Sequence, residues 1–352
     1  MSEPLILSVD AMGGDHGPTV VIPAIGIASR QMGPGVRFLI HGDETKIGPE
    51  LAKLPALAPL CEVRHTDKFI AMDAKPAQAM RRGKGSSLWN AVQAVKDGEA
   101  VAAVSAGNTG ALMAVSMLIL RLGPEINRPA LTASWPTAGG ITTVLDVGAN
   151  VSADAEQLVE FAIMGAAFHH AIQGGGRPTV GLLNVGSEDQ KGHEEVREAH
   201  ALLKATAFEF DYHGFVEGDD IAKGTVNVVV TDGFTGNILL KTAEGVVRFI
   251  ASELRNALKS SFINMMGALL ATSGLNSLKF KLDPGAVNGA PLLGLNGIVI
   301  KSHGSADARS YAAAVVVAAD LARSDFAAEI DRSVKQLSAA LLAKPLTEPE
   351  VQ

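Results

Sequence analysis

Cysteine and aromatic residues are scarce in this chain of 352 residues. Its one cysteine, Cys61, excludes an internal disulfide framework and is typical of a protein from the reducing cytosol. Aromatic residues make up 5% of the chain whereas hydrophobic residues make up 47%, so aliphatic side chains and methionine must fill the core. The composition therefore predicts a cytoplasmic protein with a large aliphatic core.

A basic leader and long apolar runs are also missing. The first ten residues carry no basic side chain and end in an acid, which is unlike a secretory signal peptide. The longest smooth apolar run, Ala111–Leu120, is half of the roughly 20 residues that span a bilayer. The net charge of −7 is unlike that of a general nucleic-acid binder, which normally has a basic face. We expect a soluble protein that does not bind nucleic acid.

The motifs of nucleotide, metal and thiol chemistry are absent from the sequence. It contains no G-x-x-x-x-G-K-[ST] motif and no G-x-G-x-x-G that follows a strand, which argues against the common nucleotide-binding loops. His169 and His170 would diverge by about 100° on a helix, and His193 does not begin an H-E-x-x-H motif. Cys61 has no glycine-rich turn beside it. We therefore predict no metal site, no thiol nucleophile and no cofactor.

Glycine, in contrast, is abundant, with 37 residues, and it recurs in one pattern. A short β-branched run leads into a glycine-rich turn and then into a helical stretch, and Ser152 is a candidate N-cap for one such helix. Strands that are apolar throughout are typical of a parallel sheet, and their alternation with helices predicts βαβ crossovers. The expected strands are Leu5–Asp10, Ala100–Val104, Ile141–Val147, Thr179–Val185, Val226–Thr231 and Gly297–Lys301.

The pattern predicts a three-layer α/β/α fold with a mostly parallel sheet. We find no linker that divides the chain, so we expect a single domain over residues 1–340 and a loose polar tail over residues 341–352.

Residues 255–284 break this pattern. Apolar side chains gather around Phe262 and Ile263, and the basic residues on either side are Arg255, Lys259, Lys279 and Lys281. We expect a helical excursion from the sheet. Its composition suits the surface of an anionic membrane, and a dimer interface is an equally good interpretation.

The glycine-rich turns have the residues that an anion site needs. Helix N-termini present free N–H groups at the carboxyl ends of parallel strands, and glycine lets the backbone approach a ligand closely. Gly13 and Gly14 form one such turn, Ser105 to Thr109 form a second, and Ser302 and His303 form a third. Each taken alone could be plain turn chemistry. Several at equivalent strand ends favour one shared anionic ligand.

Two further loops carry a charged or amide group. Lys191 stands just before an expected helix, and Asn237 stands one turn into another. A solvated lysine in a polar loop and an asparagine that caps a helix are the structural alternatives.

These loops together resemble a known family, the bacterial phosphate acyltransferases of phospholipid synthesis, which use acyl carrier protein. The similarity runs in order from residue 6 to about residue 323. Its motifs are Asp10-Ala-Met-Gly-Gly-Asp15, Lys84-Gly-Ser-Ser87, Ser105–Leu112, Leu145-Asp-Val-Gly-Ala-Asn150, Gly181-Leu-Leu-Asn184, Glu188-x-x-Lys191-Gly192, Asp232-Gly-Phe-Thr-Gly-Asn237, Pro291–Gly297 and Ser302-His-Gly-Ser305. The resemblance implies a homodimer with a phosphotransacetylase-like or isocitrate-dehydrogenase-like fold. It also implies that acyl carrier protein and inorganic phosphate are the partners.

The implied reaction needs no acyl-enzyme, because phosphate can attack the thioester carbonyl directly. The protein must then hold the anion in line and stabilise a tetrahedral oxyanion. We assign phosphate to the loops that contain Asp10, Gly13, Gly14, Ser105, Asn108, Thr109, Ser302 and His303. Lys191 and Asn237 are the candidates that stabilise the oxyanion and assist the leaving sulfur, and His303 is an alternative acid.

The acyl carrier protein is acidic, so its docking site should be basic. Candidate contacts are Arg81, Arg82 and Lys84, together with the cluster over residues 255–281. Two other functions remain open at this point. One is a short-chain phosphotransacylase that uses coenzyme A, and the other is a non-catalytic, membrane-bound sensor of acyl carrier protein.

Overall fold

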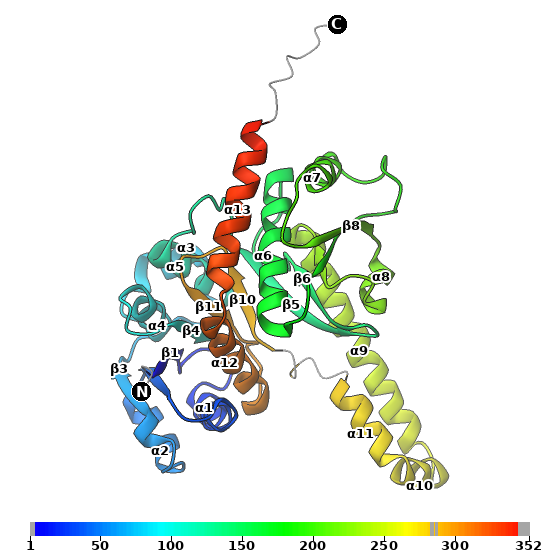
Figure 1. Ribbon diagram of the computed structural model, residues 1–352. Coiled ribbons are helices and arrows are strands. Elements are labelled where there is room, and N and C mark those ends of the chain that lie inside the picture. The colour runs from blue at the N-terminus through cyan, green and yellow to red at the C-terminus, as the bar shows by residue number, and fades with distance from the viewer. Residues whose placement is uncertain (1–3, 282–284, 286–287, 344–352) are drawn as a thin grey trace, which may run out of the picture.

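The sheet at the centre of the molecule has eleven strands in the order β3-β2-β1-β4-β11-β10-β5-β6-β9-β7-β8 (Figure 1). This computed structural model describes residues 4–281, 285 and 288–343, with side chains described except at 277–281 and 340–343. The strands are β1 (Leu5–Asp10), β2 (Val36–Gly42), β3 (Cys61–His65), β4 (Ala102–Ser105), β5 (Ala130–Thr137), β6 (Gly140–Leu145), β7 (Thr179–Leu183), β8 (Asp211–Val216), β9 (Val228–Val230), β10 (Ala290–Leu293) and β11 (Ile298–Lys301).

Helices connect the strands and cover both faces of the sheet. They are α1 (Pro18–Met32), α2 (Glu44–Ala52), the 3-10 turn η1 (Ala58–Leu60), α3 (Pro76–Arg82), α4 (Ser87–Lys96), α5 (Thr109–Leu120), α6 (Ala155–Gln173), α7 (Glu194–Ala205), α8 (Gly218–Lys223), α9 (Gly233–Lys259), α10 (Phe262–Leu270), α11 (Thr272–Lys281), α12 (Ala308–Arg323) and α13 (Phe326–Ala343). One layer of the core includes α1, α6, α12 and α13, and the other includes α4 and α5. The three-layer α/β/α prediction is confirmed.

Seven strand pairings are parallel, and three at the centre, β11–β10, β10–β5 and β5–β6, are antiparallel. The mostly parallel sheet is therefore confirmed. Because three reversals separate them, the parallel strands of the first half (β3, β2, β1, β4 and β11) run opposite to those of the second half (β6, β9, β7 and β8).

The register of the central strands brings the carboxyl ends of the two halves to one level. Ile300 near the end of β11 pairs with Pro291, and the next residue of β10, Leu292, pairs with Leu131. Thr132, which follows Leu131 in β5, pairs with Leu145 at the end of β6. The two sets of strand ends therefore face one another across the middle of the sheet, where loops from both halves can contribute to one site.

Burial and capping explain the central helix, α6. Its residues from Leu158 to His169 are buried, and Gly165 packs so closely on the sheet that a Cβ there would lie 2.6 Å from Leu145. The helix begins after Asp154, whose carboxylate accepts the Gln157 N–H at 2.9 Å in a capping box. The prediction that Ser152 caps this helix was wrong, because Asp154 brings a matching Gln157 three residues later.

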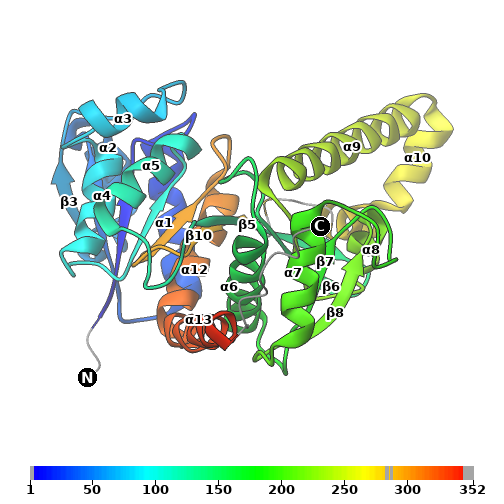
Figure 2. The same ribbon diagram turned by 90° about the horizontal axis from the view of Figure 1, so that it is seen from above.

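The predicted excursion over residues 255–284 is helical where the structure describes it. It begins in α9, which runs away from the sheet, and α10 and α11 turn back beside its far end (Figures 1 and 2). Residues 282–284 lie outside the described part of the chain, as do residues 344–352 of the predicted polar tail. The backbone of residues 341–343 belongs to α13. Within the described residues, none of the helices has the length and apolar composition needed to cross a bilayer.

Candidate active site at the carboxyl ends of the strands

Three loops meet at the carboxyl ends of β1, β4 and β11, which are neighbours in the sheet. They lead into α1, α5 and α12, so three helix N-termini point toward one place. The loops touch, since a Cβ at Gly14 would lie 2.9 Å from both the Ala106 Cβ and the Gly304 carbonyl oxygen. Gly14 also has φ +86°, a backbone conformation that favours glycine. We call these three loops the anion loops.

Asp10 anchors the anion loops from below. Its carboxylate accepts the Ser105 hydroxyl at 2.6 Å and the Met12 N–H at 3.2 Å, and it lies so close to Gly13 that a Cβ there would be 2.5 Å from Oδ2. Burial raises the pKa of Asp10, while hydrogen bonds from the Ser105 hydroxyl and the Met12 N–H oppose that rise. Asp10 therefore holds the loops in place, and its predicted contact with substrate stays a prediction.

The anion loops leave several backbone donors unused. Among the described residues, no hydrogen-bond partner is found for the N–H groups of Gly14, Asn108 and Gly304. The side chain of Asn108 is engaged, because its oxygen accepts the Ala111 N–H at 2.8 Å and its nitrogen donates to the Met72 carbonyl. The Thr109 hydroxyl is on an exposed residue at the first position of α5. Free N–H groups at helix N-termini form a ready anion site.

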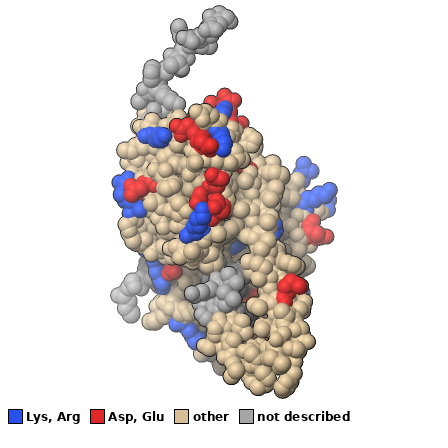
Figure 3. Space-filling model, turned by 90° about the vertical axis from the view of Figure 1, so that its right-hand side faces the viewer, with Lys and Arg blue, Asp and Glu red and all other residues tan. Residues whose placement is uncertain are grey.

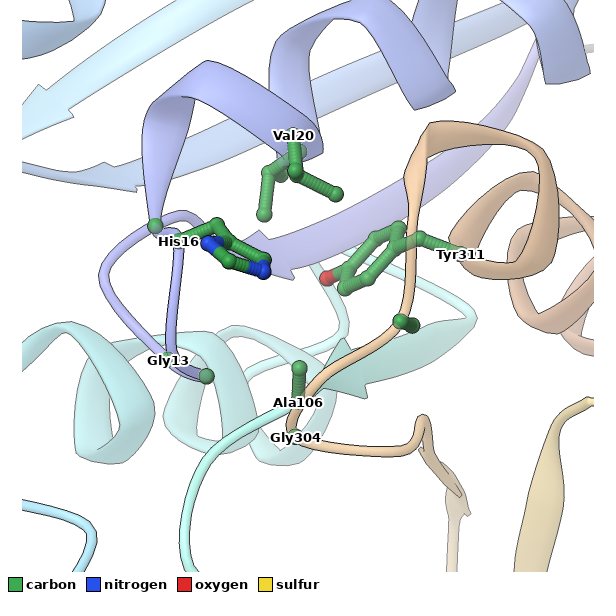
Figure 4. Close-up of a pocket in the computed structure, with 10 residues that line it drawn as sticks. Gly13, His16, Val20, Ala106, Gly304 and Tyr311 are labelled. Atoms are coloured by element: carbon green, nitrogen blue, oxygen red, sulfur yellow. The ribbon is translucent and has the colours of Figure 1, made fainter. Parts of the chain in front are cut away.

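A cavity of about 10 Å³ lies among the anion loops, with His16 and Tyr311 beside it (Figure 4). It has room for about one water-sized probe, so a phosphate ion cannot enter it. The buried Tyr311 hydroxyl donates to the Val104 carbonyl at 3.4 Å and closes this side of the loops.

Ser302 and His303 are fixed by a neighbour from another loop. The Asn288 side chain donates to the Ser302 hydroxyl at 2.8 Å and accepts the His303 N–H at 3.1 Å. Nδ1 of His303 accepts the Ser305 N–H at 3.2 Å, which leaves Nε2 as the nitrogen that carries the proton. Burial, together with the positive charges of Lys301 and Lys241, lowers the pKa of His303. The imidazole is therefore a neutral donor at neutral pH.

Lys301 is a site residue that the sequence prediction missed. Lys301 is the last residue of β11 and pairs with Ser105 of β4, which in turn pairs with Asp10 of β1. Lys301 is only 8% exposed. Its ammonium donates to the carbonyls of Ala106, at 3.4 Å, and Ser302. Burial lowers the pKa of Lys301 to about 8, while Asp15 and Asp10 act in the opposite direction. A buried positive charge thus lies beneath two of the anion loops.

The second half of the sheet also ends in a buried aspartate. Asp146 follows β6, and its carboxylate accepts the N–H groups of Leu131 (3.0 Å), Gly148 (3.1 Å), Ala149 (2.9 Å) and Asn150 (2.7 Å). Burial raises its pKa, and these hydrogen bonds oppose that rise. The turn after β6 is therefore saturated by its own carboxylate.

Asn237 stands on this turn, in the first turns of α9. A Cβ at Gly236 would lie 1.9 Å from the Asp146 carbonyl oxygen, so only glycine lets α9 approach so closely. The Asn237 side chain lies against Gly148, about 3.5 Å from where a Cβ would be, and the residue is exposed. Asp232 caps the helix, accepting the Thr235 N–H at 2.9 Å, so Asn237 is not the cap. Its amide is free to contact a ligand.

Lys191 lies at the edge of the same half, in the loop after β7. Its ammonium is 2.9 Å from the Glu188 carboxylate, and that contact raises the pKa of Lys191. Asn184 fixes the loop by donating to the Lys191 carbonyl at 3.1 Å. Neither a hydrogen bond nor an ion pair joins Lys191 to Asn237 among the described residues, so the structure places them on one half without direct contact.

Helix α9 links the second half to the anion loops. Lys241 and Glu244 form an ion pair of 3.0 Å on this helix, and the charges of both act on the pKa of His303. Lys241 was also missed by the sequence prediction, because an exposed helical lysine carries no local signal of function.

The predicted basic contacts lie in two places. Arg81, Arg82 and Lys84 are exposed at the end of α3. Arg255, Lys259, Phe262 and Ile263 are exposed on α9 and α10, and the side chains of Lys279 and Lys281 lie outside the described set. Among the described residues, no cluster of three or more His, Cys, Asp or Glu side chains could hold a metal ion.

Comparisons with known proteins agree with this architecture. The sequence pattern of a family described as fatty acid synthesis protein matches residues 5–329. A phosphate acyltransferase from Caulobacter vibrioides is 67% identical, with 97% of this chain and 95% of that protein covered. Another from Phenylobacterium zucineum is 58% identical, with 97% of each covered. The crystal structure of a phosphotransacetylase from Streptococcus pyogenes matches with a TM-score of 0.61 at 17% identity, covering 92% of this chain and 95% of that one, which shows the fold alone. The chain therefore belongs to the fatty acid synthesis protein family, among relatives that are phosphate acyltransferases.

Proposed function

We propose that this protein is an enzyme that transfers a fatty acyl group from the thioester of acyl carrier protein to inorganic phosphate. The product, an acyl phosphate, would supply the acylation steps of phospholipid synthesis. The observation that carries the proposal is the set of free N–H groups on the anion loops, next to three helix N-termini and the buried Lys301. This arrangement suits a small dianion.

The chemistry needs an anion held in line rather than a strong base. An oxygen of monohydrogen phosphate attacks the thioester carbon, and the carbon–sulfur bond breaks as the tetrahedral oxyanion collapses. The proton that phosphate loses balances the proton that the leaving thiolate gains. The absence of a Ser-His-Asp or Cys-His set from the anion loops fits this direct route.

The second half of the site would stabilise the developing charge. Asn237 offers an exposed amide on a rigid turn, and Lys191 offers a positive charge once it leaves Glu188. His303 stands among the anion loops with Nε2 as its donor, so it is an alternative source of the proton for sulfur. We assign the oxyanion to Asn237 and Lys191 because oxyanion donors must be preorganised or charged to be effective.

The test is a thiol-release assay with acyl carrier protein and coenzyme A thioesters side by side. We expect thiol release from the carrier-protein thioester only when phosphate is added, with acyl phosphate as the product. Equal or greater rates with the coenzyme A thioester would favour the short-chain phosphotransacylase. Binding of the carrier protein without phosphate-dependent release would favour the non-catalytic sensor.

A homodimer and peripheral contact with an anionic membrane are further parts of the proposal, and both rest on α9 and α10. Apolar side chains are exposed along α9, including Ile238 and Phe249, and continue on α10 with Phe262 and Ile263, which are 76% and 79% exposed. The part of the molecule formed by the far end of α9 and by α10 has few charged side chains on the face that Figure 3 shows. Such a surface is too apolar to remain uncovered in water.

Vesicle sedimentation and mass measurement separate the two roles. Ile263→Glu on α10 and Phe249→Glu on α9 form the matched pair. We expect Ile263→Glu to lower binding to anionic vesicles while the protein remains a dimer, and Phe249→Glu to yield monomers. Wild-type binding should weaken as salt rises, since each basic residue near an anionic surface contributes about 1 kcal/mol. If wild type ignores vesicles and Ile263→Glu is monomeric, α10 is only a subunit interface.

A further inference from the structure

A second, larger cavity lies beside the anion loops, in the chain between β3 and α4. It has a volume of about 530 Å³, within the range of small-molecule sites. Its walls come from the segment 67–74 and from α3 and the turn that follows it. We call it the α3 cleft. Neither the assigned phosphate ligands nor the oxyanion donors line it.

The walls of the α3 cleft are held by hydrogen bonds. The Thr66 hydroxyl donates to the Gly85 carbonyl at 2.7 Å, and the Ser87 N–H donates to the Lys68 carbonyl at 3.0 Å. The wall of the cleft is therefore joined to the N-terminus of α4, which begins at Ser87. Hydrogen bonds therefore fix the walls of the cleft to this half of the sheet.

The segment that forms one wall of the cleft contacts the anion loops at Met72. The Met72 carbonyl accepts the Asn108 side chain, and the Met72 methyl group would lie 2.8 Å from a Cβ at Gly304. Pro76 lies equally close to Gly110, at 2.8 Å from where a Cβ would be. The segment that forms the wall of the cleft therefore also contacts two of the anion loops.

The lining of the cleft is mixed in its chemistry. Lys68 and Arg82 supply positive charge, and neither forms an ion pair among the described residues. Asp67 and Asp73 supply negative charge on the same walls. Gln78 can exchange hydrogen bonds with amides, and Phe69 and Ile70 give an apolar surface. A fatty acyl chain binds best in a groove lined only by apolar side chains, because burying charged groups against it costs free energy. The mixed lining of the α3 cleft therefore does not fit an acyl chain.

We propose that the α3 cleft receives the phosphopantetheine arm of the carrier-protein thioester. That arm has a phosphodiester at one end, two amides and a dimethyl group in the middle, and sulfur at the other end. Its phosphodiester pairs with Arg82 and Lys68, its middle lies on the mixed wall, and its thioester reaches the anion loops past Met72. The exposed Arg81 and Lys84 then face the acidic body of the carrier protein. This inference rests on the proposed function for the identity of the thioester.

The test compares holo carrier protein, which has the arm, with apo carrier protein, which lacks it. Two variants fill the cleft at a half-buried wall position, Ala74→Leu and the larger Ala74→Trp, and Arg82→Glu reverses the charge at its mouth. Lys96→Glu, at the far end of α4, is the charge-reversal control. Binding is measured by calorimetry, and circular dichroism checks the fold of every variant.

We expect wild type and Lys96→Glu to bind holo carrier protein at least about tenfold more tightly than apo. Ala74→Trp should abolish this difference, Ala74→Leu should reduce it, and KM for phosphate should stay unchanged in both. The proposal is overturned if the folded Ala74 variants keep the holo preference. It is also overturned if they only shift the preferred acyl chain to shorter lengths, which would assign the cleft to the acyl group. The preference for holo over apo carrier protein is measured by binding and needs no turnover. It can therefore be interpreted even if the acyl-transfer assay of the proposed function fails.

Discussion

The two halves of the sheet end in similar turns, which differ in how the buried aspartate of each turn forms hydrogen bonds. Asp10 ends β1 and Asp146 follows β6, both are buried, and each is followed by a turn with glycine. Asp146 accepts the N–H groups of its own turn, so that turn has few donors left for a ligand. Asp10 accepts the Met12 N–H of its turn and also joins β1 to Ser105 of the neighbouring strand. Among the described residues, the Gly14 N–H has no hydrogen-bond partner.

This difference indicates a division of labour. The first half is preorganised to receive an anion, because its donors are free and its loops are locked from below. The second half is a rigid platform on which α9 presents Asn237. Of the four predictions that follow, the first three each change a residue on one side of this contrast, and the fourth tests whether the reaction needs a metal ion.

The largest effect should come from Gly13→Ala. The added Cβ would lie 2.5 Å from Asp10 Oδ2 and 2.7 Å from the Gly107 nitrogen, so two anion loops must move apart. Because several donors shift together, we expect turnover to fall by at least about 10³-fold. Steady-state kinetics with varied phosphate checks this. Gly176→Ala, at a glycine with no heavy atom within 4 Å of the added Cβ, is the control and should keep full activity.

A smaller loss should follow from changes in the second half. Lys191→Ala and Asn237→Ala should each lower kcat by about 10²- to 10³-fold, the usual effect of removing one oxyanion donor. KM for phosphate should change little, since neither residue belongs to the anion loops. Lys223→Ala removes an exposed lysine that is ion-paired with Asp219 at 2.6 Å, and it serves as the control. Wild-type turnover in both site variants would remove these residues from the mechanism.

The pH dependence should report Lys301. Its pKa of about 8 means that the ammonium loses its charge as pH rises through this value, so kcat/KM for phosphate should fall there. Lys301→Gln should lower kcat/KM by roughly 10- to 100-fold at pH 7 and flatten the profile above pH 7.

Titration of Lys301 does not itself destabilise the fold at alkaline pH. The folded pKa of Lys301 lies below its ordinary value of 10.5, so the unfolded chain binds more protons between about pH 8 and 10.5. This group alone therefore makes the protein more stable as pH rises through that window. An unchanged alkaline profile in Lys301→Gln would show that another group titrates.

The smallest effect, none at all, is expected from removal of metal ions. The proposed chemistry relies on N–H groups and two lysines in place of a cation such as Mg²⁺. Activity should persist after exhaustive EDTA treatment, as measured by acyl phosphate formation. A loss that one divalent ion restores would contradict this route.

Strands that are continuous apolar runs before a glycine turn could be predicted from the sequence. β1 was predicted with its observed bounds. β11 was predicted from Gly297 and is observed to begin one residue later, at Ile298. The strands β2, β3, β5, β8 and β10 were not predicted. In β5 and β8, polar residues or glycine interrupt the apolar run, as in Asp211-Tyr-His-Gly-Phe-Val216. Their partners in the sheet stabilise them, and single-sequence patterns do not show those partners.

The site divides in the same way. The anion loops were predicted because their glycines and hydroxyls follow apolar strands directly. Lys301 was missed because it is buried only through the pairing of β11 with β4, which places it beside Ser105. Lys241 was missed because it comes close to His303 only through the relative placement of the two halves of the sheet. Local sequence predicts the loops, whereas strand order and register determine which groups lie together.

The location of a bound anion tests the division between the two halves most directly. Tungstate, an analogue of phosphate, can be placed in a crystal of the whole protein by its anomalous scattering. We predict one ion within hydrogen-bond distance of the N–H groups of Gly14, Asn108 and Gly304. An ion on the Lys191 loop or on the turn after Asp146, with the anion loops empty, would contradict the assignment of phosphate to the first half.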